Sequence, residues 1–437
     1  MKRIVIIRLL TTLTMLAAVS VRAGTKHSLS SRFMSYEGRI MCGYQGWFRA
    51  AGDGSGCGWV HYGSGGFAPT NCTVELWPDV SEYEKTYPTG FKSEDGSPAR
   101  VFSSWDESTV DVHFRWMQEY GIDGVFMQRF FVATRTENSR AESRVVLAHA
   151  LTAAQRHGRA IAVMYDLSGL KPGEDCSSLI QDWKELVDKL KLTSQGTNQP
   201  YLYHRGKPLV AIWGIGFSDR PYNLHAIGLE KLLDFLKNDP QYGGCSVMLG
   251  VPTNFRDLRA DTVSDPYLHK IMAQADVIMP WLVGRFSSRS EGELTRYGAQ
   301  VKADAAWCAE RKLDYAPCVY PGFSWRNLSG RKDPLAAIPR LRGRFYWGLM
   351  TKAIQAGAKM IYVAMFDEMD EGTAIFKCTN QPPHDQPPAE FLSFEGLPSD
   401  RYLWLTGQAG KILRGEIPVD QELYKNTNRN LIENATR

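Results

Sequence analysis

The chain has 437 residues, of which 43% are hydrophobic, and a formal net charge of +4. This length can bury one large core or two smaller ones. Four basic and no acidic residues lie within the first 22 positions, so the remainder is close to neutral. Nucleic-acid binding needs a basic excess that this remainder lacks, and we therefore expect no nucleic-acid partner.

The N-terminus has the pattern of a secretory signal peptide. A basic start with Lys2, Arg3 and Arg8 precedes an apolar run over 9–19 and a small-residue cleavage site ending at Ala23. We predict a signal peptide at 1–23 and a mature domain at 24–437 that is secreted or periplasmic. No later apolar run is long enough to span a bilayer, so we expect no membrane span.

Short apolar runs rich in β-formers then alternate with longer segments of helical period. The predicted strands are 39–48, 124–131, 160–166, 208–214, 245–251, 275–283, 314–320 and 359–366. The predicted helices are 108–120, 140–157, 177–192, 229–238, 292–311, 338–356 and, outside the alternation, 400–413. This order is typical of parallel strands joined by crossover helices.

Eight strands alternating with about as many helices predict one (β/α)₈ TIM barrel, an α/β fold, whose first and last strands are neighbours. In the helix at 338–356, Pro339 sits near the expected start, where its missing N–H costs little. An open doubly wound sheet is the alternative. No G-x-G-x-x-G motif opens the first βα turn, so a dinucleotide fold has no specific support.

Residues 50–98 stand outside the alternation and are rich in Gly, Pro and aromatics. We interpret this segment, called the excursion below, as a long ordered loop after the first strand that decorates the barrel mouth. Within it, Cys57 and Cys72 either form a disulfide or are small hydrophobic residues. Its His61, Asp79 and Glu82 either complete a ligand site or are ordinary loop and cap residues.

In such a barrel the active site lies at the C-terminal ends of the strands. Tyr or Trp occurs at six of the eight predicted ends, usually beside a residue that can form several hydrogen bonds. Aromatic faces stack on sugar rings while the polar groups pair with hydroxyls, so we expect an oligo- or polysaccharide partner. The candidate substrate-binding residues are Tyr44, Gln45, Trp47, Gln128, Arg129, Tyr165, Asp166, Trp213, Trp281, Arg285, Tyr320, Trp325 and Asp367. Any single Trp among them can instead be core packing.

The last predicted strand runs into the segment DEMDE, which places four carboxylates in residues 367–371. Crowded carboxylates repel, so one stays protonated while another ionises, as a general acid and base require. Glycoside hydrolysis uses two carboxyl groups in this way, and we predict Glu368 and Glu371 as the catalytic pair at the bottom of the largest polar and aromatic pocket. A solvated acidic loop is one alternative. A cation site is another, although the EF-hand calcium-loop spacing is absent.

Two arginines, Arg129 and Arg285, are the cations expected nearest the barrel mouth. Arg offers bidentate recognition of planar anions, so each is a candidate partner for a uronate or sulfate. Alternatively, each neutralises the acidic segment at 367–371.

The segment 368–373, EMDEGT, resembles the E-x-x-E-G-T segment that ends the last barrel strand in glycoside hydrolase family 99, the endo-α-mannosidase clan. Residues 43–48 (GYQGWF), 77–79 (WPD) and 120–124 (YGIDG) also resemble secreted bacterial proteins described as family 71/99-like. The resemblance covers nearly all of the mature chain. It implies a retaining α-glycosidase without metal or cofactor.

By the same resemblance, Glu368 is a base on the sugar 2-hydroxyl, giving an epoxide intermediate, and Glu371 is the acid/base, with Asp367 tuning both. The family segment typically reads N-E-W-H-E, whereas Asp367, Met369 and Asp370 here replace Asn, Trp and His. Fold and reaction class therefore carry over better than mannan specificity. The competing functions are a noncatalytic glycan-binding barrel and a metal-dependent hydrolase built on the acidic segment.

Overall fold

The apolar runs of the alternation meet in one parallel sheet, which a computed structural model describes over residues 24–383 and 387–426. The predicted signal peptide at 1–23 lies outside the described residues, so both it and the domain boundary at residue 24 stay predictions. The strands of the sheet are β1 (Ile40–Tyr44), β4 (Gly124–Phe130), β5 (Ala160–Asp166), β7 (Lys207–Trp213), β8 (Ser246–Val251), β9 (Val277–Pro280), β10 (Asp314–Tyr315), β11 (Cys318–Val319) and β12 (Ile361–Val363), with the short β6 (Tyr203–His204) pairing antiparallel to β7.

The sheet closes through one interrupted strand. Its order is β10-β9-β8-β7-β5-β4-β1-β12-β11, and β10 and β11 are successive halves of the strand predicted at 314–320. The N–H of Ala316 still donates to Ile278 of β9 (2.9 Å), while the carbonyl of Pro317 accepts from Tyr362 of β12 (3.0 Å). The segment thus joins both ends of the sheet. This closure and the parallel pairing of β1 with β12 confirm the eight-stranded barrel, and the open doubly wound sheet is wrong.

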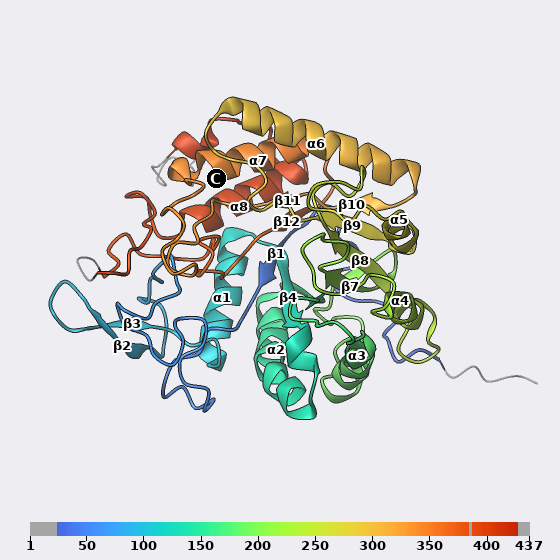
Figure 1. Cartoon of the computed structure of the whole chain (residues 1–437), viewed down its shortest axis with the longest axis horizontal. Coiled ribbons are helices and arrows are strands. Elements are labelled where there is room, and N and C mark those ends of the chain that lie inside the picture. Colours follow the sequence, from blue (N-terminus) through green and yellow to red (C-terminus); the bar gives the residue numbers. More distant parts are fainter. Residues whose placement is uncertain (1–23, 384–386, 427–437) are drawn as a thin grey trace, which may run out of the picture.

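Helices surround the strands (Figure 1). They are α1 (Glu107–Tyr120), α2 (Glu137–His157), α3 (Ser177–Lys189), α4 (Leu229–Asn238), α5 (Tyr267–Met272), α6 (Glu291–Glu310), α7 (Arg344–Gln355) and α8 (Arg401–Leu413), with short 3₁₀ turns at η1 (Phe131–Thr134), η2 (Leu341–Gly343) and η3 (Leu423–Lys425). Strands such as β5 are buried along their whole length, as parallel strands covered on both faces must be. No helix within the described ranges is long and apolar enough to cross a membrane.

Two helix predictions need correction. The helix expected over 338–356 begins only at Arg344, and Pro339 is not at its start. Ile338 instead pairs through its backbone with Phe323, and Leu341 and Arg342 adopt left-handed conformations that a helix cannot continue. The six-residue α5 was not predicted, because so short a helix shows too little periodicity.

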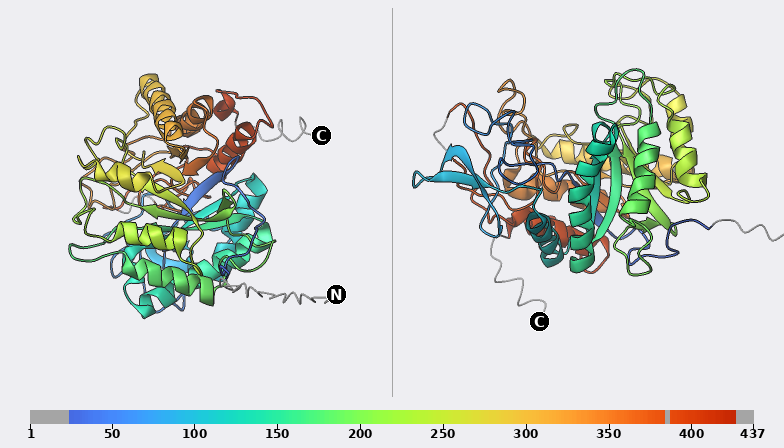
Figure 2. Two further views of the ribbon diagram at one scale, coloured as in Figure 1. Left: turned by 90° about the vertical axis from the view of Figure 1, so that its right-hand side faces the viewer. Right: turned by 90° about the horizontal axis from the view of Figure 1, so that it is seen from below.

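The excursion is ordered, and its last part forms a hairpin with the residues that follow it, which the sequence did not predict. Its strands β2 (Tyr87–Lys92) and β3 (Pro98–Val101) are antiparallel and lie outside the ring of helices, beyond α1 (Figures 1 and 2). Backbone N–H groups of Glu75 and Asp79 donate to Met369 (2.9 Å) and Lys377 (3.0 Å), respectively. The excursion therefore runs alongside the chain that follows β12.

All eight cysteines are free, and seven are buried. Cys57 lies at the surface with its Sγ 3.1 Å from Glu142 Oε1, whereas Cys72 is buried and its Sγ approaches the Val74 carbonyl. The Cys57–Cys72 disulfide is therefore wrong. The alternative reading, small buried hydrophobes, describes Cys72 and the six others.

Candidate active site

The acidic segment forms a closed loop over residues 367–373, called the carboxylate loop below. After β12 the chain turns back on itself, so that the N–H of Phe376 donates to the carbonyl of Phe366 (3.0 Å). Inside this turn, the N–H groups of Thr373 and Ala374 both donate to the carbonyl of Glu368, at 3.1 and 3.0 Å. The backbone of the loop is thereby fixed by its own hydrogen bonds.

Three other segments hold the same loop from outside. The excursion contributes the N–H of Glu75, which donates to Met369, and the segment after β11 contributes the N–H of Ser324, which donates to the carbonyl of Glu371 (3.0 Å). The buried Arg340 donates from Nη2 to the carbonyls of Gly372 (2.9 Å) and Ala374 (2.7 Å). These hydrogen bonds to backbone carbonyls fix the backbone from which the acidic side chains project.

A cleft of about 400 Å³ opens at the C-terminal ends of the strands. It is lined by Gln45, Trp47, Gln128, Phe130, Asp166, Ser168, Trp213, Phe217, Asp219, Arg220, Trp281, Arg285, Trp325, Met365, Glu368 and Glu371. Ten of the fifteen predicted site residues are in this set. The structure brings together side chains from the ends of β1, β4, β5, β7, β9 and β12 and from the loop after β11.

The two glutamates of the cleft have different surroundings. Glu368 accepts hydrogen bonds from Gln45 Nε2 (2.8 Å) and Thr373 Oγ1 (3.3 Å). Burial and the charges of Glu371 and Asp370 raise the pKa of Glu368 well above its usual range, and the two donors act against this rise by favouring the ionised form. For Glu371, burial and the charges of Asp370 and Asp166 raise the pKa to about 8, and no hydrogen bond from the described residues acts against this rise. The donors therefore favour Glu368 as the ionised member and Glu371 as the protonated one.

The two aspartates of the loop point elsewhere. Asp367 is fully buried and accepts from the backbone N–H groups of Gln45 and Gly46, both at 2.8 Å, so it ties the end of β12 to the end of β1. Burial raises the pKa of Asp367 to about 7. Asp370 pairs with His61 of the excursion, and the His61 Nδ1 atom lies 3.1 Å from Asp370 Oδ2.

Aromatic rings form the walls of the cleft. Trp213 meets Trp281 edge-on, with ring centroids 5.2 Å apart. It has room because a Cβ on Gly250 of β8 would lie only 2.4 Å from its Cδ1. On another wall, Trp47 stacks on Phe130 at 5.1 Å. Trp325 is 41% exposed, so its ring is available to a ligand.

Several buried polar atoms of these lining side chains have no hydrogen-bond partner among the residues that the structure describes. They are the Oε1 acceptors of Gln45 and Gln128 and the Nε1 donors of Trp47 and Trp213. Buried polar groups are nearly always hydrogen-bonded, so such atoms call for a ligand or water. A hydroxyl both donates and accepts, and a polyhydroxyl ligand can therefore satisfy both kinds of atom.

Five predicted site residues do not line the cleft: Tyr44, Arg129, Tyr165, Tyr320 and Asp367. Arg129 is buried and donates from Nε to Asp182 of α3 at 2.8 Å, and Tyr165 donates to the same carboxylate at 2.9 Å. The remaining two rings lie in the core, with the hydroxyl of Tyr44 2.9 Å from His113 Nδ1 and that of Tyr320 donating to the Phe286 carbonyl. None of these side chains faces a ligand in the cleft.

The cations of the cleft also differ from expectation. Arg129 forms an ion pair with Asp182. Arg285 lines the cleft but pairs with Asp261 at 3.1 Å, so neither arginine is paired with the carboxylate loop. Sequence reasoning missed Arg220, whose guanidinium carbon lies 5.2 Å from the Trp213 ring centroid. Its charge lowers the pKa of Asp166, which burial raises to about 6. Arg220 follows β7 by seven residues, and no pattern distinguishes it there.

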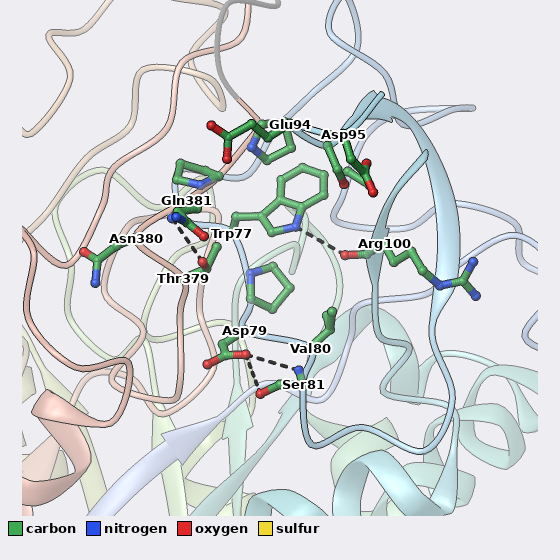
Figure 3. A pocket seen from close by; sticks show the side chains of 15 residues that line it. Trp77, Asp79, Val80, Ser81, Glu94, Asp95, Arg100, Thr379, Asn380 and Gln381 are labelled. Carbon is green, nitrogen blue, oxygen red and sulfur yellow. Dashed lines mark hydrogen bonds between the residues drawn. The ribbon is translucent and has the colours of Figure 1, made fainter. Parts of the chain in front are cut away.

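A second cavity of about 690 Å³ is larger than the cleft, but Trp77 is the one aromatic residue among the described residues of its lining, whereas the cleft that holds both glutamates has several aromatic walls. The second cavity lies between the β2–β3 hairpin and residues 379–383, with Asp79 and Trp77 in its lining (Figure 3). The Trp77 ring is only 4% exposed, stacks on Phe67 and donates to the Arg100 carbonyl, so it offers no open face to a sugar. Glu82 pairs with Lys377 and Arg115, away from both cavities.

In the described part of the chain, no group of three or more His, Cys, Asp and Glu side chains is arranged to hold a metal ion. The oxygens of Asp367 are occupied by backbone N–H groups, and an oxygen of Asp370 by His61. The geometry of the carboxylate loop thus gives a cation site no support.

No family model and no curated protein matches the sequence. Among solved structures, the GH99 endo-alpha-mannosidase from Bacteroides thetaiotaomicron is similar, with a TM-score of 0.62 and 15% identity over 88% of this chain and 99% of that chain. Its complex with bis-tris-propane gives 0.61 and 15%, over 87% and 98%. A protein named only as glycoside hydrolase-like gives 0.50 and 12%, over 80% and 98%.

The chain has the fold of the GH99 endo-alpha-mannosidase. This likeness, at 15% identity, confirms the resemblance at the level of architecture. The alignment covers 98% and 99% of the two solved chains, so the likeness in fold extends over nearly their whole length.

The burial of Arg129 generates a prediction about stability. Replacing Arg129 with Met leaves Asp182 charged and unpaired in the core, and we expect a loss of about 3–5 kcal/mol in the free energy of unfolding. Urea denaturation followed by circular dichroism measures this loss. The double variant Arg129→Met with Asp182→Leu should recover most of it, whereas equal losses in single and double variants would show that the pair is not the cause.

Proposed function

We propose that this protein is a glycoside hydrolase that cleaves an α-linked glycan with retention of configuration. The observation that carries the proposal is the pair Glu368 and Glu371 in an aromatic-walled cleft, one carboxyl supplied with hydrogen-bond donors and the other without. Two carboxyl groups in unlike environments are what glycoside cleavage needs. The barrel fold shared with an endo-alpha-mannosidase supports the same class.

The hydrogen-bond donors around Glu368 support a division of roles between the two glutamates. In the first step, Glu368 takes the proton of the sugar 2-hydroxyl, whose oxygen attacks the anomeric carbon and forms an epoxide. The leaving oxygen departs with the proton of Glu371, whose pKa of about 8 keeps it protonated at neutral pH. In the second step, Glu371 takes a proton from water, which opens the epoxide at the anomeric carbon, and Glu368 returns its proton to the 2-oxygen.

Substrate binding follows from the walls. Trp47, Trp213 and Trp281 supply ring faces and edges, and the unpartnered atoms of Gln45 and Gln128 accept from hydroxyls. Asp166 and Arg220 add polar contacts beside Trp213. A panel of plant, fungal and algal polysaccharides, incubated with the purified mature chain, identifies the glycan by the reducing ends released.

The division of roles predicts different behaviour for two isosteric variants. Glu371→Gln should lower turnover of the natural glycan by roughly 10²–10⁴-fold and be partly rescued on activated aryl glycosides, which need no protonation of the leaving group. Glu368→Gln should be slow on both substrates. Steady-state kinetics with each substrate class measures this.

The control is Glu119→Gln, a surface carboxyl of α1 paired only with Arg115, which should behave as the parent. Identical behaviour of the two cleft variants on both substrates would contradict the roles. Full activity in both would contradict the site. Unchanged glycan binding without any turnover in the parent would instead favour a noncatalytic glycan-binding barrel.

The raised pKa of Glu371 predicts the alkaline limb of the activity profile. The acid must be protonated, so kcat/KM should be constant below pH 8 on this side and fall about tenfold per unit above it. The apparent value belongs to the coupled pair. A pH profile measured with the natural glycan tests this. An alkaline limb near pH 5 would contradict a raised pKa for Glu371.

We further propose that the protein is secreted or periplasmic, on the signal pattern of residues 1–23. The mature chain should begin at or near Gly24. N-terminal sequencing of material from the periplasm or culture medium tests this, and recovery of a chain that starts at Met1 would contradict it.

A further inference from the structure

One histidine of the excursion contacts both the carboxylate loop and a wall of the cleft. His61 places Nδ1 3.1 Å from Asp370 Oδ2, and its ring stacks on Trp47 with centroids 3.6 Å apart and planes 6° apart. Its carbonyl accepts from Thr73 Oγ1 (2.7 Å), and Phe48 lies edge-on at 6.2 Å. The imidazole is therefore held in one orientation between two elements of the cleft.

The two partners of His61 act on different parts of the cleft. Trp47 lines the cleft and stacks on Phe130 as well as on His61. Phe130, Trp47 and His61 therefore form one aromatic stack that joins β4, the segment after β1 and the excursion. Asp370 does not line the cleft, but it lies in the chain between Glu368 and Glu371. Its negative charge acts on both carboxyls.

The surroundings of Asp370 give His61 a distinct role. The charged groups that act on one another here are Asp367, Glu368 and Glu371 of the carboxylate loop, with Asp166 of β5 next to Glu371 and Arg220 beyond it. All except Arg220 are acidic, and Arg220 lies over Trp213. Within the described residues, His61 is the cationic or donor group paired with Asp370.

We propose that His61 is a positioning residue: through its bond to Asp370 and its stack on Trp47, it sets the acid strength of Glu371 and fixes the Trp47 wall. The part that concerns Glu371 rests on the proposed glycosidase function. The pairing and the stack do not. The excursion is thereby a component of the acid/base apparatus rather than a decoration of the barrel mouth.

The first test is the pH profile of kcat/KM in a double-mutant cycle. Asp370→Asn removes a negative neighbour of Glu371 and should move the alkaline limb down by on the order of half a pH unit. His61→Gln removes the imidazole paired with Asp370 at 3.1 Å, leaves more of the carboxylate's charge acting on Glu371, and should move the limb up. In the Asp370→Asn background, His61→Gln should move it no further. A limb unmoved by His61→Gln, or moved equally in both backgrounds, would overturn the proposal.

The second test needs no turnover. A histidine ring stacked on an indole quenches its fluorescence, so His61→Gln should raise tryptophan emission at one fixed pH. In the Trp47→Phe background the same substitution should leave the emission unchanged, because the stacked indole is gone. Emission that His61→Gln leaves unmoved, or raises equally in both backgrounds, would overturn the stack.

The chain offers a matched control. His225 pairs with Asp265 at 2.7 Å and stacks on Tyr267 at 3.9 Å, the same arrangement outside the cleft. His225→Gln should leave both readouts as in the parent. If the fluorescence cycle behaves as expected while no glycan is cleaved, the proposed function fails and the pairing stands. If cleavage occurs with a pH profile that His61→Gln leaves unchanged, the proposed function stands and the role of His61 fails.

Discussion

The crowding of four carboxylates in one loop is the constraint on which the rest of the site depends. Desolvated like charges are unfavourable unless each finds a partner. Here the partners come from two other segments. After β1, the N–H groups of Gln45 and Gly46 donate to Asp367 and the Gln45 amide donates to Glu368, while His61 of the excursion pairs with Asp370. Glu371 alone faces the open cleft with no donor from the described residues, and it is the carboxyl to which we assign the acid role.

This distribution of partners explains why barrel closure and the excursion matter to the chemistry. Gln45 is next to Glu368 only because β1 pairs with β12, which joins the two ends of the barrel. His61 and Glu75 reach the carboxylate loop only because the excursion runs along the chain after β12. Glu75 also accepts from Ser324 Oγ at 2.6 Å, so the loop after β11 is fixed by the same residue. A change that loosens either connection alters the carboxyl groups without touching them.

The sequence was sufficient for the strands but not for the direction of every residue at their ends. Fully buried apolar runs of the right length mark parallel strands, and all eight were found. Side chains alternate along a strand, however, so neighbours at one strand end face opposite sides. Gln128 and Asp166 face the cleft, whereas Arg129 and Tyr165 face Asp182 of α3. The prediction included both members of the pairs Gln128/Arg129 and Tyr165/Asp166, and one member of each pair was wrong. Contacts between distant segments, such as His61 with Asp370 or Arg220 over Trp213, carry no periodic signal at all.

The departures from the family segment acquire a physical meaning in this fold. Met369, which stands in place of Trp, is fully buried and makes no part of the cleft lining, so this position gives the cleft no aromatic contact, and Trp325 offers an exposed ring there instead. Asp370 stands in place of His, and the imidazole of His61 from the excursion pairs with it at 3.1 Å. Two side chains, Asp370 and its partner His61, thus stand where the family segment has one histidine. The two glutamates therefore still have an imidazole nearby, whereas the aromatic wall of the cleft is changed. The first feature concerns the proposed reaction, and the second concerns which glycan fits.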